Sequence, residues 1–260
     1  MAKRARPTPT GFRFQMSNPS AEKKIERSVG RLITRLKRET RETVRDVILD
    51  GYKKGLHPNT IALDIAGRVN PATGTRTGGI IGMSRPQADA ARNLRDRLES
   101  GDASEMRKVL GMQLRDKRFD GVIEKAIEAG EAIPAEKIDR MVDRYVDASL
   151  ELRGSTIART ETMSAVSSSS LEAFEQVLEK TEYSDRAVTR TWRTSGNANV
   201  RDSHAEMEGQ VVEGLDEPFV SGLGNELMQP GDTASGAPAE DVINCVCDVE
   251  IDIDFTEGVT

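Results

Sequence analysis

Two stretches near the end of the sequence decide its fold: Thr191-Trp192-Arg193-Thr194 and Ile243-Asn244-Cys245-Val246-Cys247-Asp248. The segment that they bracket holds the only Trp of the chain, both Cys and one of the two His, His204. Each stretch belongs to a longer segment, residues 187–194 or 245–253, in which apolar or β-branched residues alternate with others; this period of two predicts strands. The connecting residues are rich in Gly, Pro and Asp, which predicts long loops. We therefore expect a small C-terminal α/β domain on a short antiparallel sheet.

The two cysteines and His204 form a candidate metal site. Cys245 and Cys247 lie two positions apart, so on a strand both thiols face the same side. Two thiolates, an imidazole and one carboxylate or water make a reasonable zinc ligand set, and zinc would stabilise a domain with few core residues. The carboxylate would come from Asp202, Asp232 or Asp248. The absence of an obvious general base favours a structural ion. The alternative is a pair of buried thiols beside a His that hydrogen-bonds a loop carbonyl.

The order of short motifs resembles that of the phage Mu F-like minor head proteins, also called head morphogenesis proteins. The matching pieces are Ile157-Ala158-Arg159-Thr160-Glu161, Trp192-x-Thr194, Arg201-Asp202-Ser203-His204 followed by Gly209-Gln210, Pro230-Gly231-Asp232, and Asn244-Cys245-x-Cys247. Each piece is weak by itself, but five in the right order make a fairly specific signal. The helical region before Gly154 resembles the family only in general character.

The resemblance implies a structural minor head protein of a tailed phage rather than an enzyme. Such a protein would bind the portal protein, other head proteins or the capsid interior during assembly, and it would reach packaged DNA through a basic N-terminal arm. It would be found in the virion, at the capsid interior or portal vertex, and in the host cytoplasm during assembly. The sequence shows no signal peptide and no run of roughly 18 apolar residues, so we expect no membrane partner.

Composition and charge agree with an elongated helical protein that has a thin core. Hydrophobic residues make up 37% of the chain, aromatic residues 4% and charged residues 31%. Residues 1–45 contain 13 Lys or Arg against 4 Asp or Glu, whereas residues 197–260 contain one basic residue against 15 acidic ones. The basic end can contact phosphates or an acidic protein surface, although a solvated helix face explains it equally well. The acidic end is a poor surface for nucleic acid.

We expect an α+β protein in three parts: a flexible basic arm at residues 1–17, a mainly helical region at 18–180 and the C-terminal domain at 181–260. The arm has no helical periodicity, so it would order only on a partner. Its partner-binding residues would be Lys3, Arg4, Arg6, Phe12, Arg13 and Phe14.

Apolar spacing, capping residues and Gly or Pro breaks predict the helices of the middle region. They should cover residues 20–51, 59–69, 84–100, 103–115, 120–129 and 134–180. The last helix is expected to bend near Gly154-Ser155. The Gly-rich residues 78–82 are not a phosphate-binding loop, because no Gly-Lys-Ser/Thr follows them. A DNA-binding helix-turn-helix is disfavoured, because residues 59–69 contain no basic residue apart from Arg68.

Arg159 and Glu161 point to different faces of the last helix, so they should not pair directly. We expect these two residues and Trp192 to hold the C-terminal domain against the helix. A catalytic Arg/Glu pair is the less favoured alternative, because no His, Cys or Gly-rich loop lies nearby. A second function is also open: the C-terminal domain could be a metal-dependent hydrolase, with His204, Cys245 and Cys247 holding a catalytic zinc.

Overall fold

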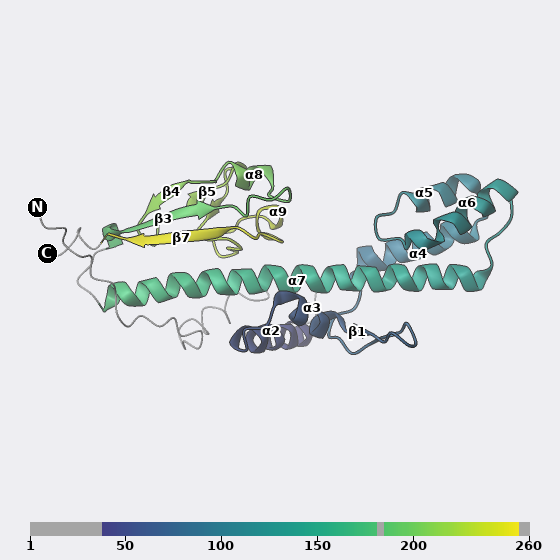
Figure 1. Ribbon diagram of the computed structural model, residues 1–260, viewed down its shortest axis with the longest axis horizontal. Coiled ribbons are helices and arrows are strands. Elements are labelled where there is room, and N and C mark those ends of the chain that lie inside the picture. Colours follow the sequence, from purple (N-terminus) through teal and green to yellow (C-terminus); the bar gives the residue numbers. More distant parts are fainter. Residues whose placement is uncertain (1–37, 181–184, 255–260) are drawn as a thin grey trace, which may run out of the picture. The chain divides into compact units, whose positions relative to one another are not determined.

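The computed structural model describes residues 38–180 and 185–254. The protein is α+β, as the sequence predicts: helices form the first part, and small antiparallel sheets with short helices form the C-terminal region (Figure 1). The described residues group into two compact units, which divide between Thr162 and Met163 within one long helix. The predicted arm and its six partner-binding residues lie outside the described residues.

The first unit is built from helices and one minimal hairpin. Its elements are α2 (Arg38–Lys53), α3 (Pro58–Ala66), β1 (Arg68–Val69), β2 (Arg76–Thr77), α4 (Arg85–Glu99), α5 (Ala103–Leu110), a 3-10 turn (Lys117–Phe119), α6 (Asp120–Ala129) and the first part of α7 (Ala135–Glu179). The helix predicted for residues 20–51 is described only from Arg38, and α6 has the predicted bounds. Gly130, with a φ of 67°, ends α6 at the predicted residue.

Two predicted helices are shorter than expected, and local backbone geometry explains both. α3 ends at Ala66 because Gly67 takes a φ of 85°, after which Arg68–Val69 pairs with Arg76–Thr77 instead of continuing the helix. α5 ends at Leu110 with Gly111 as its C-cap, and the chain then turns into the short 3-10 helix. In both places a glycine ends the helix before the apolar pattern does.

The N-terminus of α4 follows its sequence signature. Ser84 and Gln87 form a capping box, in which the Ser84 backbone N–H donates to Gln87 Oε1 at 2.9 Å. The amide nitrogen of Gln87 also donates to the backbone oxygen of Ser149 at 2.8 Å, which ties the start of α4 to α7. One apolar cluster then fills the space between α4, α5, α6 and the first part of α7. Its buried members are Ala91, Leu94, Leu98, Met106, Val109, Ile123, Ile133, Ile138, Met141 and Tyr145.

The long helix α7 runs through Gly154 without interruption, so the predicted bend is wrong. Gly154 is instead the point at which α7 meets α3. A Cβ added to it would lie 2.6 Å from the Ala66 Cβ and 3.1 Å from the Ala62 backbone oxygen. The glycine therefore permits close packing of α3 on α7, and this packing outweighs the low helix propensity of glycine.

Replacing Gly154 with Ala should destabilise the first unit by about 1–3 kcal/mol, because the clash with α3 outweighs the gain in helix propensity. Gly121→Ala in α6 is the matched control: nothing lies within 4 Å of the added methyl, so it should stabilise the helix by up to about 1 kcal/mol. Urea unfolding followed by far-UV circular dichroism measures both changes. Equal stabilisation by the two substitutions would show that α3 and α7 do not pack at Gly154.

The second unit is organised on a three-stranded antiparallel sheet of order β4-β3-β7 (Figure 1). The central strand is β3 (Val188–Arg193); β4 (Val211–Glu213) and β7 (Asp248–Ile253) flank it, with Trp192 opposite Val249. The remaining elements are a 3-10 turn (Asp185–Ala187), α8 (Asp202–Ala205), the two-residue strands β5 (Phe219–Val220) and β6 (Glu226–Leu227), and α9 (Ala239–Val242). Both predicted strands are present, although the second begins at Asp248 and not at Cys245.

The C-terminal part of α7 belongs to this second unit and packs on the sheet. Leu171 lies with Val188 and Leu215 in a small apolar cluster, against which Ile251 also packs. Nearer the unit boundary, Gly231 approaches the same helix so closely that an added Cβ would lie 3.1 Å from the Ser164 Cα. The φ of Gly231 is 76°, a backbone conformation that residues with a side chain rarely adopt. The helix therefore presents small residues where the loop rests on it.

Arg190 is fully buried at the centre of β3, on the same face as Val188 and Trp192. Its guanidinium group donates to the backbone oxygens of Gly214 at 2.7 Å, Met228 at 2.8 Å and Glu217. It also lies 5.2 Å from the ring centroid of Phe219. One cation thus satisfies three loop carbonyls that no strand pairing reaches, and sequence alternation alone gave no sign of this role.

Substituting Arg190 with Ala should destabilise the second unit by about 3 kcal/mol or more, because three loop carbonyl groups lose a charged donor and the fully buried side chain leaves a cavity. Arg193→Ala is the matched control on the same strand. Its side chain is 48% exposed and pairs with Glu208 and Glu250, so its loss should cost less than about 1 kcal/mol. Denaturant unfolding followed by the fluorescence of Trp192 reports this unit alone. Similar costs for both variants would contradict the anchoring role of Arg190.

Candidate metal centre

His204, Cys245 and Cys247 come together in the second unit as one buried group. The sulfur of Cys245 lies 3.4 Å from His204 Nδ1 and that of Cys247 lies 3.5 Å from the same nitrogen. The candidate ligand atoms all lie within 4.8 Å of one another. His204 is 1% exposed and each cysteine 3%, and both thiols are free. The group could hold a metal ion.

The backbone before β7 brings the two thiols to one side. α9 ends at Val242, and Asn244 then takes a φ of 57°, the only positive φ of a non-glycine residue in the described part of the chain. From Cys245 to Cys247 burial alternates, with Val246 exposed between two buried thiols. The predicted orientation of the cysteines is thus present, although it arises in an extended segment that precedes the strand.

The Arg-Asp-Ser-His motif is attached to the segment that carries the cysteines at three points. Arg201 donates to the backbone oxygens of Glu240 and Ile243, the latter at 2.5 Å. Ser203 Oγ donates to Asp241 Oδ1 at 2.8 Å, and His204 faces the two sulfurs. Three of the four residues of this short motif therefore contact residues 240–247.

Trp192 forms an apolar wall of the group. Its indole is fully buried and meets the His204 ring edge to face, with centroids 5.4 Å apart and planes at 82°. It makes a similar contact with Phe219 at 5.3 Å. These contacts restrict the imidazole on the side of β3. The inter-domain roles of Trp192, of half-buried Arg159 and of buried Glu161 stay predictions.

The two thiols have different proton affinities. A hydrogen bond from the Cys247 thiol lowers the pKa of Cys245. The pKa of Cys247 is raised, because its thiol is the donor in that hydrogen bond and is itself buried. A thiolate is the form of cysteine that binds metals.

The model of the family described as phage Mu protein F like protein matches residues 117–250, just over half of the chain. The chain belongs to this family. It is a family of phage minor head proteins. The matched residues include His204, both cysteines and every motif that carried the resemblance. No curated protein and no solved structure matches the chain significantly.

In this Mu F-like protein none of the three carboxylates considered as a fourth ligand belongs to the buried group. Asp202 is exposed on α8. Asp232 accepts hydrogen bonds from Met228 N, Ala234 N and Ser235 Oγ and so shapes its own loop. Asp248 is exposed at the start of β7. The proximity of Asp202 to His204 in the sequence does not place it near the sulfurs, because consecutive residues of α8 point in different directions.

A different carboxylate, Asp241, lies beside the imidazole. Its Oδ1 is 3.8 Å from His204 Nε2, and its side chain is fully buried. Burial alone would raise the pKa of Asp241, but hydrogen bonds from Asn225, Ser221 and Ser203 outweigh burial and lower it. The sequence did not distinguish Asp241 from the other acidic residues of this region. The only signal was its position directly before the apolar pair Val242-Ile243.

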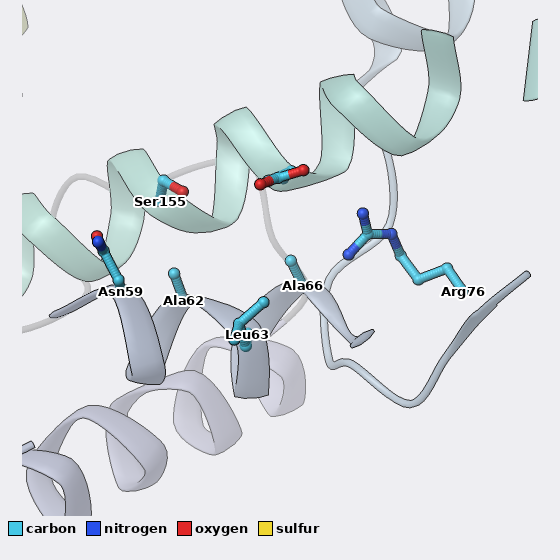
Figure 2. A pocket seen from close by; sticks show the side chains of 7 residues that line it. Asn59, Ala62, Leu63, Ala66, Arg76 and Ser155 are labelled. Carbon is cyan, nitrogen blue, oxygen red and sulfur yellow. The ribbon is translucent and has the colours of Figure 1, made fainter. Parts of the chain in front are cut away.

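A second candidate site is a cavity of about 280 Å³ in the first unit, between α3 and α7 (Figure 2). Its lining consists of Asn59, Ala62, Leu63, Ala66, Arg76, Glu151 and Ser155. Arg76 already donates to Asp147 Oδ1 at 3.1 Å and to the backbone oxygens of Gly67 and Asp147. Its charge thus holds the β1–β2 hairpin on α7. The group of His204, Cys245 and Cys247 is therefore the stronger candidate site.

Among the helices of residues 38–180 and 185–254, none has the length and apolar character that a membrane-spanning helix requires.

Proposed function

We propose that this protein is a minor head protein of a tailed phage that binds the portal or the capsid interior during head assembly. The observation that carries the proposal is the family match over residues 117–250. In this proposal residues 18–180 provide the assembly surface, residues 181–260 form the C-terminal domain, and the basic arm at residues 1–17 contacts a partner or packaged DNA. The protein would act at the portal vertex or capsid interior of the virion.

The partner is tested by co-sedimentation of the purified chain with portal oligomers and with procapsids of the same phage. We expect binding to at least one of them at moderate salt, because the chain belongs to a family of phage minor head proteins. A variant without residues 1–17 is the control for the arm. It should keep the Trp192 unfolding transition and lose salt-dependent DNA binding. Absence of co-sedimentation with either particle at every salt concentration would refute the proposal.

We also propose that His204, Cys245 and Cys247 hold a structural zinc ion. Two sulfurs and one imidazole nitrogen are the donor set that zinc prefers, and a water or carboxylate would complete the tetrahedron. The ion would link α8 to the segment before β7 in a unit with little regular structure. A catalytic zinc, as in the hydrolase alternative, needs a position open to substrate. The near-complete burial of all three residues supports the structural role instead.

Protein purified without chelator should contain about one zinc per chain by elemental analysis. Cys247→Ser should remove the zinc and lower the Trp192 unfolding transition, and a chelator should have the same effect on the unsubstituted protein, because metal binding and folding are coupled. Val246→Ser is the matched control, since its side chain lies between the cysteines but is 39% exposed. Far less than one zinc per chain, with unfolding unchanged by chelator, would leave only a buried pair of thiols.

A further inference from the structure

The nitrogen of His204 that faces away from the sulfurs has no hydrogen-bond partner among the described residues. Nδ1 points at Cys245 and Cys247, while Nε2 is buried and lies 3.8 Å from Asp241 Oδ1, beyond hydrogen-bond length. The two ring nitrogens of a neutral imidazole share a single N–H hydrogen, and the nitrogen that binds a metal must not carry it. Binding through Nδ1 therefore requires the hydrogen on Nε2.

Asp241 is a buried carboxylate held in one orientation from several sides. Ser203 donates to its Oδ1 at 2.8 Å, and Ser221 and Asn225 donate to its Oδ2 at 2.7 and 2.6 Å. His204 is the only basic group within 4 Å of the carboxylate in the described part of the chain. Burying a carboxylate without a Lys or Arg partner is costly. The network leaves Oδ1 directed at the imidazole as well as at Ser203.

We infer that Asp241 is a positioning residue, which keeps the hydrogen of His204 on Nε2 and leaves Nδ1 free to bind the metal. The inference rests on the proposed zinc site. A short movement of the imidazole would convert the 3.8 Å contact into a hydrogen bond, as metal-binding histidines commonly make with a carboxylate. Ser203 is next to His204 in the sequence and holds the same carboxylate, so one motif supplies the ligand and fixes its orienting partner.

Asp241→Asn tests the inference, because Asn has nearly the same shape but removes the negative charge. In metal-free protein, nitrogen-15 NMR of the histidine side chains should show the hydrogen of His204 on Nε2 in the unsubstituted chain and a mixture of both forms in the variant. The chain has only two histidines, so His57→Gln assigns the signals. Zinc affinity, measured by competition with a chromophoric chelator, should fall about 10–100-fold.

Asp202→Asn is the matched control, since it removes an exposed carboxylate from the same motif and should leave both readouts unchanged. If Asp241→Asn does not fold, Ser221→Ala keeps the carboxylate but removes one of its donors, and it should shift both readouts in the same direction by less. An unchanged position of the hydrogen, with unchanged zinc affinity, would overturn the role of Asp241. A protein that binds no zinc in any form would overturn the metal site, and the NMR measurement would still report separately on Asp241.

Discussion

The contact between the His204 imidazole and the sulfurs of Cys245 and Cys247 joins two segments of the second unit that the sheet does not connect. The sheet has one six-residue strand at its centre, and only one of its neighbours is as long. Between β4 and β7 the chain forms no strand longer than two residues among those described. With so little regular structure, few backbone groups pair along a ladder, and buried polar side chains must fix the loops. His204, Cys245 and Cys247 do this for α8 and the segment before β7.

Arg190 and Asp241 follow the same principle with opposite charges. Arg190 collects backbone oxygens from the loops after β4 and β6, whereas Asp241 collects hydroxyl and amide donors from α8 and from the β5–β6 turn. Each charge is buried, and each is surrounded by groups of the complementary polarity. Phe219 lies against Arg190 and Trp192 against His204, and the two rings contact each other, so this aromatic pair connects the two networks. The second unit is therefore stabilised more by the hydrogen-bond networks of Arg190 and Asp241, around one aromatic pair, than by a broad apolar core.

The sequence was informative wherever a local rule and the tertiary structure agree. The capping residues of α4, the bounds of α6 and the alternation in β3 are local signals, and the shared side of the cysteines follows from their spacing. The packing of α3 on α7 at Gly154 could not be predicted, because the residues that require the glycine, Ala62 and Ala66, lie in another helix. Arg190 and Asp241 were missed because charged residues are normally exposed, and their acceptors and donors are distant in the sequence. The candidate ligands were identified by their scarcity, but the carboxylate beside them was not.

Charge distribution limits where this protein can meet nucleic acid if it acts in the phage head. Residues 197–260 contain a single basic residue, Arg201. Its guanidinium group is already committed to the carbonyl oxygens of Glu240 and Ile243, so it cannot also neutralise a phosphate without releasing the segment that carries the cysteines. The 15 acidic residues of the same region repel a polyanion. Within the proposed function, residues 197–260 must therefore face protein or solvent, and the basic N-terminal end is better suited to contact packaged DNA.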